Sequence, residues 1–423
     1  MSYTAYPVYK PSGVEWLGDV PEHWGIVRLK YLCDIETGTH DTENADEDGL
    51  YPFFVRSQTV EHAALFTHNT EAILTAGDGA GVGKVFHHYS GPFLAHQRVY
   101  FLLNFKFVSA RFLFHYVKAL FAKVALDGGA KSTVDSLRRP VFQQFLCCVP
   151  SLSEQTAIAA YLDQHTQQID RLIQRQQRLI ELLQEKRQAV ITHAVTRGLN
   201  PDAPLKHSGV EWLGEVPEHW ESIRLRYVAT LNPSKQELKC WPSQTPVSFL
   251  PMEAIGDDNT IDTSRTATIE DKQQGFTFFR DGDCCLAKIT PCFENGKGAI
   301  LRGMTNSIGF GTTELIVFRP RSSVTVSFLF ALVHSHSIRN LGEGWMYGAG
   351  GQKRVPEDFF RNLKITLPPL PEQIAIAAYL DTETQQIDNV VSHAQRSITL
   401  LQERRSALIS AAVTGKIDVR AAV

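Results

Sequence analysis

The chain has 423 residues, a formal net charge of −3, and 43% hydrophobic and 21% charged residues. This length allows about two to three domains, and the composition is that of an ordinary globular protein. The slightly acidic average means that any nucleic-acid binding has to come from local basic surfaces. No apolar run approaches the roughly 18 residues of a membrane helix, and the first residues contain no signal-peptide core, so we expect a cytoplasmic protein without membrane contact.

Cysteine and histidine patterns indicate neither a disulfide framework nor a metal site. The seven cysteines lack C-x-x-C spacing, and two pairs are adjacent, Cys147-Cys148 and Cys284-Cys285, so buried reduced thiols are expected. The histidines show no H-x-x-x-H or H-E-x-x-H spacing, which predicts no metal. Asn-Pro-Pro-Tyr and Asp-Pro-Pro-Tyr, which hold the flipped base in adenine methyltransferases, are also missing. We therefore predict no catalytic residues.

One phrase occurs twice. "SGVEWLGDVPEHW" spans Ser12–Trp24, and "SGVEWLGEVPEHW" spans Ser208–Trp220, 196 positions later. Its tryptophans are large apolar anchors, and the same phrase in both halves does not suit the reading of different sequences. We interpret it as a packing element; base contact is the alternative.

A glycine-rich stretch, "AGDGAGVGKVFHH" (76–88), lacks the spacing of a phosphate loop and of a dinucleotide fingerprint. The second half has "FENGKGAIL" in the corresponding place. Both read as hairpin turns, with Lys84 and Lys297 at the tips. Each tip either grips a DNA phosphate through glycine amides and the ammonium, or is simply solvated.

Beyond each hairpin, the two halves carry different polar residues before an apolar strand. "HQR" (96–98) corresponds to "TTE" (312–314). Glutamine and arginine pair with adenine and guanine edges, whereas threonine and glutamate favour other contacts. Different side chains at one structural position suit two readers of different bases; polar strand edges facing water are the alternative. The candidates here are Gln97, Arg98, Thr312 and Thr313.

Two donor-rich loops, "GGAKSTV" (128–134) and "GAGGQKRV" (348–355), each precede one of the two long helices predicted below. Such loops suit phosphate oxygens and base edges, and a plain surface loop is the alternative. Their candidate DNA contacts are Lys131, Ser132, Thr133, Gln352, Lys353 and Arg354. Further candidates are Arg56 in "FFVRSQ", and Lys288 and Thr290 in "LAKITP".

A longer repeat predicts two long helices. Residues 149–198 and 367–416 match at an offset of 218, and apolar positions recur in steps of four and three, from Ile158 and from Ile376. This 3.5-residue period is typical of a coiled coil. Ser151 and Glu154 fit a capping box, Pro371 suits a first turn, and Gly198 and Gly415 suit helix ends.

Two apolar stripes in one chain most simply bury each other. We expect an antiparallel pair in which facing residue numbers sum to about 570, which places Leu162 on Leu408 and Arg187 near Glu383. A parallel pair joined by the intervening domain, or pairing between molecules, are the alternatives.

The fold class predicted is therefore α+β. Two globular, mixed α/β domains are separated by two long antiparallel helices that form a coiled coil, with internal pseudo-two-fold symmetry. The predicted boundaries are 1–150 for the first domain, 151–198 for the first helix, 199–368 for the second domain, and 369–423 for the second helix and the C-terminal tail.

With these repeats in view, the chain resembles a DNA-specificity subunit of a Type I restriction–modification system over essentially its whole length. The resemblance is carried by "PEHW", "PSLSEQTAIAAYLD" and "RQAVITHAVTRG", and by "PVSFLPMEAIG", "LAKITPCFENGKGA", "FGTTELIVFRP" and "LPPLPEQIAIAAYLD". It implies a non-catalytic protein in which each variable domain reads one half of a split site in double-stranded DNA. The paired helices then set the gap.

The resemblance also implies partners: two methyltransferase subunits that dock on the helices, and restriction subunits that join the assembly. Identical partners need identical docking surfaces. The candidate docking residues therefore lie on the near-identical helix starts: Gln155, Asp163, Gln373 and Asp381. No cofactor is expected in this chain, because S-adenosylmethionine would bind the methyltransferase. A scaffold that reads no bases, and a diverged methyltransferase or nuclease, are the alternative functions.

Overall fold

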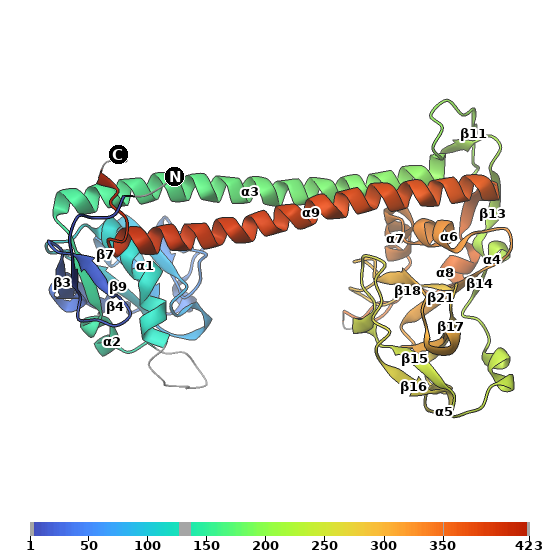
Figure 1. Cartoon of the computed structure of the whole chain (residues 1–423), viewed down its shortest axis with the longest axis horizontal. Helices are drawn as coiled ribbons and strands as arrows, with labels where there is room; N and C mark the ends of the chain where they lie inside the picture. Colours follow the sequence, from blue (N-terminus) through green and yellow to red (C-terminus); the bar gives the residue numbers. More distant parts are fainter. Residues whose placement is uncertain (1–3, 127–136, 350, 421–423) are drawn as a thin grey trace. The chain divides into compact units, whose positions relative to one another are not determined.

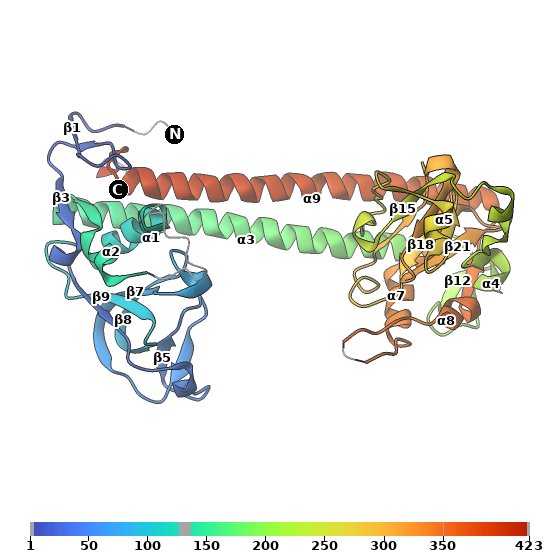
Figure 2. The same ribbon diagram turned by 90° about the horizontal axis from the view of Figure 1, so that it is seen from below.

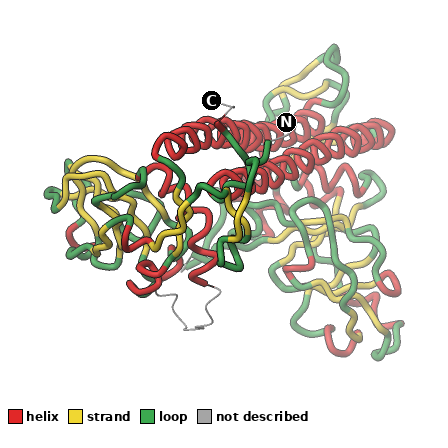
Figure 3. Tube along the Cα trace, turned by 60° about the vertical axis from the view of Figure 1, so that its left-hand side comes forward, coloured by secondary structure: helices red, strands yellow, loops and turns green. Residues whose placement is uncertain are grey.

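The computed structural model describes residues 4–126, 137–349 and 351–420. The chain divides into two units, one made of Met1–Gln177 with Gln395–Val423 and the other of Arg178–Ala394, here called the first and the second unit. Each combines a domain of strands and short helices with segments of two long helices, α3 (Leu152–Arg197) and α9 (Leu370–Val413) (Figures 1 and 3). The predicted α+β class with two long helices is confirmed.

A six-stranded sheet forms the centre of the first unit's domain. Its order is β4-β9-β7-β8-β5-β6, and neighbours are antiparallel except β5 and β8. Helix α1 (Ala110–Leu126) contacts β7 and β8 (Figure 2), and α2 (Arg139–Gln144) follows it along the chain. The strands of this unit are β1 (Tyr9–Pro11), β2 (Asp19–Pro21), β3 (Gly25–Arg28), β4 (Asp34–Thr37), β5 (Tyr51–Phe54), β6 (Glu61–Ala63), β7 (His68–Ala76), β8 (Phe86–Ala95), β9 (Val99–Leu103) and β10 (Leu146–Val149).

The second unit's domain has two four-stranded sheets, β14-β21-β18-β19 and β16-β15-β20-β17. Its strands are β11 (Leu205–His207), β12 (Glu215–Pro217), β13 (Glu221–Arg224), β14 (Ala229–Leu231), β15 (Pro246–Leu250), β16 (Thr266–Thr268), β17 (Thr277–Arg280), β18 (Cys284–Ala287), β19 (Gly298–Ile300), β20 (Ile308–Gly311), β21 (Leu315–Pro320) and β22 (Lys364–Leu367). Its helices besides the long pair are α4 (Leu225–Val228), α5 (Ile269–Lys272), α6 (Val326–Val333), α7 (His336–Glu343) and α8 (Glu357–Asn362). The α6 helix contacts β18, β19 and β21.

The long helices begin and end close to the predicted residues. Gly198 and Gly415 follow their ends with positive φ angles of 73° and 71°, a backbone conformation that glycine adopts without steric cost. Only one of the two hydrogen bonds of the predicted capping box is present. The Ser151 hydroxyl accepts a bond from the Glu154 amide at 3.4 Å, but the Glu154 carboxylate turns away to the repeated phrase.

The buried stripe of each helix departs from the predicted 3.5-residue period. Leu172, Leu179 and Val390, expected inside, are 43%, 39% and 44% exposed. Ile173, Ile180 and Val391, their next neighbours along the chain, are half-buried, and Ile398 is buried. The stripe therefore follows the 3.6-residue period of a straight helix, which drifts about 20° per heptad from the 3.5-residue pattern.

Ion pairs fix the antiparallel arrangement within each unit. In the first unit, Arg405 of α9 bonds Asp170 of α3 with its Nε at 2.8 Å and its Nη2 at 3.3 Å. In the second unit, Arg187 Nε of α3 lies 3.5 Å from Asp388 Oδ1 of α9. The prediction that Glu383 lies near Arg187 was wrong, because Arg187 pairs with Asp388 instead. The residue numbers of both ion pairs sum to 575, whereas the predicted facing pairs sum to about 570.

The repeated phrase packs against the long helices in both units. Trp24 is fully buried, and its indole Nε1 donates to the Glu154 carboxylate at 3.2 Å. In the same way, Trp220 Nε1 donates to Glu372 at 3.1 Å. His23 and His219 contact the same carboxylates at 3.0 and 2.8 Å. The phrase occurs twice because each unit uses it to fasten its domain to the start of a long helix.

Candidate nucleic-acid interface

Two segments predicted separately as DNA contacts, the turn after β7 and residues 96–98, meet in the first unit beside Leu137. The turn after β7 donates its Gly77 amide to the Arg98 carbonyl at 2.8 Å. The segment before α2 donates its Leu137 amide to the Gly77 carbonyl, also at 2.8 Å. We call this place the first reading cluster. Lys131, Ser132 and Thr133 lie just before Leu137, outside the described residues.

The second unit repeats this backbone arrangement. The Lys288 amide donates to the Glu314 carbonyl at 2.8 Å, and the Val355 amide donates to the Lys288 carbonyl at 2.9 Å. We call this place the second reading cluster. Thr290 joins it, because its hydroxyl donates to the Gly351 carbonyl and accepts from the Lys353 amide. The two clusters therefore share one backbone frame with different side chains.

Acidic residues hold the arginines of the first reading cluster. Asp78 accepts hydrogen bonds from Arg56 at 3.1 Å and from Arg98. Burial opposes the ionisation of Asp78, but the bonds from these two guanidinium groups outweigh it and lower the pKa of the carboxyl. The Arg98 side chain remains 59% exposed, so part of the guanidinium faces solvent. The Gln97 amide donates to Asp41 at 2.6 Å.

In the second reading cluster, a carboxylate–guanidinium pair fastens one candidate. Arg354 donates to both carboxylate oxygens of Glu314, each at 2.9 Å, and this bidentate pairing fixes the guanidinium plane. Thr312 is also engaged, because its hydroxyl accepts from the Glu314 amide. The exposed side chains of Thr313, Gln352 and Lys353, and the half-buried Lys288, make no hydrogen bond to other described residues. These four are the donors available to a ligand.

The two predicted hairpin lysines differ. Each lies in a turn between antiparallel strands, β7 and β8 for Lys84, and β18 and β19 for Lys297. Lys84 is exposed, whereas the Lys297 ammonium turns inward and donates to the Met252 carbonyl at 3.0 Å. The structure thus gives Lys297 a bond inside the domain, while Lys84 remains available.

Gln155 and Gln373, predicted to dock a partner, have no exposed surface. The Oε1 atom of Gln155 accepts from the Ser109 amide at 2.6 Å, and that of Gln373 accepts from the Thr325 amide at 2.9 Å. Each amide nitrogen also donates to two carbonyls, one in the same turn (Phe107 or Ser323) and one just before the long helix (Pro150 or Pro368). A fully buried side chain cannot contact a partner in this conformation, so both glutamines fasten the domain to the helix.

Asp163 and Asp381, the other two docking candidates, have different surroundings. Arg111 of α1 bonds Asp163 through Nε and Nη2, and His115 Nε2 lies 2.9 Å from the same carboxylate. Asp381 is exposed, and its carboxylate has no bond to other described residues. Of the four docking candidates, Asp381 therefore offers the most accessible surface.

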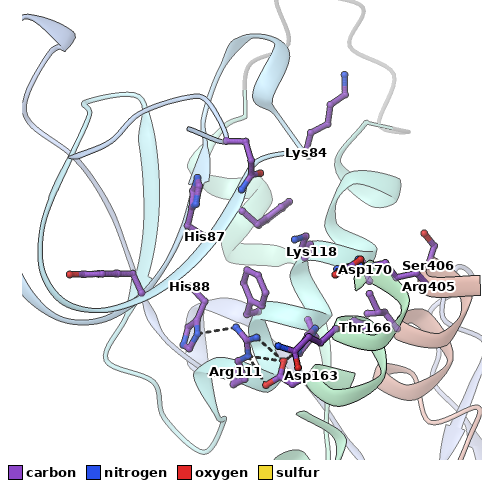
Figure 4. Close-up of a pocket in the computed structure, with 18 of the residues that line it drawn as sticks. Lys84, His87, His88, Arg111, Lys118, Asp163, Thr166, Asp170, Arg405 and Ser406 are labelled. Carbon is purple, nitrogen blue, oxygen red and sulfur yellow. Dashed lines mark hydrogen bonds and ion pairs between the residues drawn. The ribbon is translucent and has the colours of Figure 1, made fainter. Parts of the chain in front are cut away.

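A cleft of about 1260 Å³ lies between the sheet, α1 and the long helices of the first unit (Figure 4). Its floor carries the Arg111–Asp163 pair, and His88 Nδ1 lies 3.3 Å from Arg111 Nη1. Among the described residues, no group of three or more histidine, cysteine, aspartate or glutamate side chains is placed to hold a metal ion.

Two buried histidines, His115 and His334, make the stability of the folded chain depend on pH. Burial lowers the pKa of His115 to about 4, although Asp163 favours its charged form, and burial likewise lowers the pKa of His334 to about 4. In the unfolded chain both histidines bind a proton near pH 6.5. Above that pH they are neutral in both states, and the stability of the folded chain is not reduced by their protonation. The free energy of unfolding falls as the pH drops from about 6.5 to 4, by up to about 3 kcal/mol per histidine.

We therefore expect His115→Gln to flatten this dependence, because glutamine does not titrate and keeps a donor for Asp163. Between pH 7 and 5 the variant should lose about 2 kcal/mol less than the parent chain. Urea unfolding at both pH values measures this difference. The exposed His62 provides the control, and a His115→Gln profile parallel to that of His62→Gln contradicts the assignment.

Sequence reasoning missed the partners of the predicted residues. Asp78 stands six residues before Lys84 and Glu314 directly follows Thr313, but the pairing of each with an arginine from a distant segment depends on the fold. The ion pairs of the long helices left a clearer signal. Asp170 and Asp388 stand in the repeated "QQID", and both they and their arginine partners are related by the offset of 218.

A model of the Type I restriction modification DNA specificity domain matches residues 21–182 and 217–394. The specificity subunit of Type I restriction enzyme EcoEI from Escherichia coli is 38% identical over 199 residues, which are 44% of this chain and 33% of that protein. The match to the EcoAI subunit likewise spans about a third of its length. The EcoDI subunit is 25% identical over 405 residues, covering 89% of this chain and 86% of that one.

Two solved structures share the fold. A chain from the work "Structural basis underlying complex assembly and conformational transition of the type I R-M system" superposes with a TM-score of 0.68 at 16% identity, covering 93% of this chain and 98% of that chain. The HsdS subunit from Thermoanaerobacter tengcongensis gives a TM-score of 0.50 at 17% identity, covering 94% and 98%. No helix in the described part of the chain is long and apolar enough to cross a membrane.

Proposed function

The chain belongs to the Type I restriction modification DNA specificity family, and from this premise we propose that it is the non-catalytic subunit that directs such a complex to its DNA sequence. Each unit reads one half of a bipartite site in double-stranded DNA. Two methyltransferase subunits dock on the long helices and methylate adenine with S-adenosylmethionine bound to them, and restriction subunits join the assembly in the cytoplasm.

One observation carries this proposal: two reading clusters with the same backbone frame and different side chains. Gly77, Arg98 and Leu137 are joined by the same two backbone bonds as Lys288, Glu314 and Val355. A scaffold without base readout has no reason to diversify the middle of each half while it keeps the long helices and the repeated phrase. Protein groups that contact base edges discriminate bases through their donors and acceptors, so unlike side chains suit unlike half-sites.

The long helices support the proposed spacing role. Helix α3 runs from Leu152 to Arg197 without interruption, and its residues belong first to one unit and then to the other. A continuous helix is stiffer than a flexible linker of equal length, which would smear the distance between two readers. We propose that the gap between the half-sites is set in this way.

We also propose that the methyltransferase docks on exposed faces near the starts of the long helices. Burial of Gln155 and Gln373 removes them from that surface. Tyr379 and Asp381 are exposed on α9, close to its start, and offer an aromatic ring and a carboxylate. We propose this face as part of the dock.

Methylation mapping tests the proposed function. The chain is expressed with its methyltransferase subunit in a host that lacks such systems, and modified adenines are located by sequencing. We expect a split motif with two unlike halves and a fixed unspecified gap. A stable complex without methylation indicates a scaffold, and methylation by the purified chain alone indicates an enzyme; either result contradicts the proposal.

A further inference from the structure

The cleft of the first unit is strongly cationic in a chain whose net charge is −3. Five lysine and arginine side chains line it against two aspartates, Asp163 and Asp170. The five basic residues are Lys84, Arg111, Lys118, Arg171 and Arg405. Since Asp163 is bonded to Arg111, and Asp170 to Arg405, three positive charges have no acidic partner within the cleft.

Lys118 of α1 is one of these three. It is half-buried, and its ammonium makes no hydrogen bond or ion pair with another described residue. Figure 4 shows it in the same part of the cleft as Asp170 and Arg405. Burial lowers the pKa of Lys118, and the neighbouring Arg405 and Arg111 lower it further, whereas Asp170 raises it. A cationic donor in these surroundings is stabilised by an anion that enters the cleft.

The cleft adjoins the first reading cluster along the chain. Asp78 belongs to that cluster, and Lys84, six residues later in the same turn, lines the cleft. Six residues span at most about 21 Å when fully extended. This is less than one turn of duplex DNA, which measures about 34–36 Å. The first reading cluster and Lys84 therefore lie within one duplex turn of each other.

The corresponding cleft of the second unit has different chemistry. Arg187 lines it together with three acidic residues, Asp258, Asp381 and Asp388. The counterpart of Lys118, at the offset of 216 that relates Ser109 to Thr325, is His334. Burial lowers the pKa of His334 to about 4, so this side chain is neutral at pH 7. An anion site is therefore expected in the first unit and not at its counterpart.

We propose that the cleft of the first unit binds backbone phosphates of the DNA duplex through Lys118 and Lys84. These contacts are independent of sequence and lie beside the first reading cluster. The inference rests on the proposed function for the identity of the ligand, since the charge pattern alone specifies a phosphate-bearing polyanion. It adds to base reading a fixed electrostatic contact next to the long helices.

The test measures how the affinity of the full chain for a duplex of random sequence depends on salt. Each phosphate contact contributes about 0.9 to the slope of log K against log salt. Lys118→Gln and Lys84→Gln are each expected to reduce the slope by about one, and Lys118→Arg should keep it. Lys364→Gln, an exposed charge change in the second unit, is the control and should leave the slope unchanged.

Unchanged slopes for both glutamine variants overturn the proposal, as does a parent chain that binds no duplex at low salt. Unchanged slopes combined with lost binding of the methyltransferase subunit would make the cleft a protein-docking site and equally overturn it. The methylation map separates this result from the proposed function. A reduced slope without a methylated motif supports the cleft alone, and a methylated motif with unchanged slopes supports the reader alone.

Discussion

Replacing residues 33–146 with the corresponding segment of a family member of different specificity is expected to change one half of the methylated motif and to leave the other half intact. The boundaries lie next to each other in the fold. The Leu29 amide donates to the Phe145 carbonyl at 2.8 Å, and β3 pairs with β10 beside this bond. The two ends of the exchanged segment therefore lie close together, next to the retained strand β3.

The expected effect is large because specificity accumulates over base pairs. Each mismatched pair costs about 1–3 kcal/mol, so two mismatches in the exchanged half already reduce affinity for the old site by about 2–6 kcal/mol. Methylation mapping of the chimera shows the new motif directly. The gap should be unchanged, because α3 and α9 are retained.

The matched exchange in the second unit is the control. The Leu225 amide donates to the Leu363 carbonyl at 2.9 Å, and β13 pairs with β22 beside it, so residues 229–364 can be exchanged at an equivalent place. That chimera should change the other half of the motif. A change in both halves from either exchange would contradict independent reading by the two units.

The repeated helices were predictable because they combine period, caps and repetition. The helix ends at Gly198 and Gly415 could be predicted because glycine readily adopts the positive φ angle that ends a helix, and a glycine is visible in the sequence. The exact buried stripe was not predictable in the same way. A leucine at 172 or 179 fits a 3.5-residue pattern by sequence, but a straight helix turns the neighbouring isoleucines, Ile173 and Ile180, inward.

The candidate site was predictable as a set of segments but not as a set of free side chains. The turn, the polar residues before the strand and the donor-rich loop stand far apart in the sequence, and each was selected by composition. Which arginine is neutralised depends on contacts between them, such as Arg354 with Glu314. Lys118 carries no local signal at all, because its cleft is formed by elements that only the fold brings together.

The largest loss of stability is expected for Trp24→Ala and Trp220→Ala. Each indole is fully buried, and replacing a buried tryptophan by alanine typically costs about 3–5 kcal/mol. Each substitution also removes a donor from a glutamate that starts a long helix. The surroundings are tight: a Cβ atom on Gly415 would lie 3.2 Å from the Trp24 ring, and one on Gly198 would lie 3.2 Å from the Trp220 ring.

Phenylalanine at the same positions separates packing from hydrogen bonding. Trp24→Phe keeps most of the apolar volume and removes the indole N–H, so a smaller loss of about 1–3 kcal/mol is expected. Urea unfolding followed by circular dichroism measures both variants. Trp241→Ala is the control, because this tryptophan is 43% exposed and its removal should cost little.

The same variants decide between the two interpretations of the repeated phrase. If Trp24 and Trp220 fasten the domains to the helices, the phenylalanine variants lose stability but direct methylation to an unchanged motif. A motif relaxed at one base pair, with stability preserved, would instead make the phrase a base contact. Its burial against Glu154 and Glu372 favours the first result, because an indole with no exposed surface cannot reach a DNA groove without leaving its site.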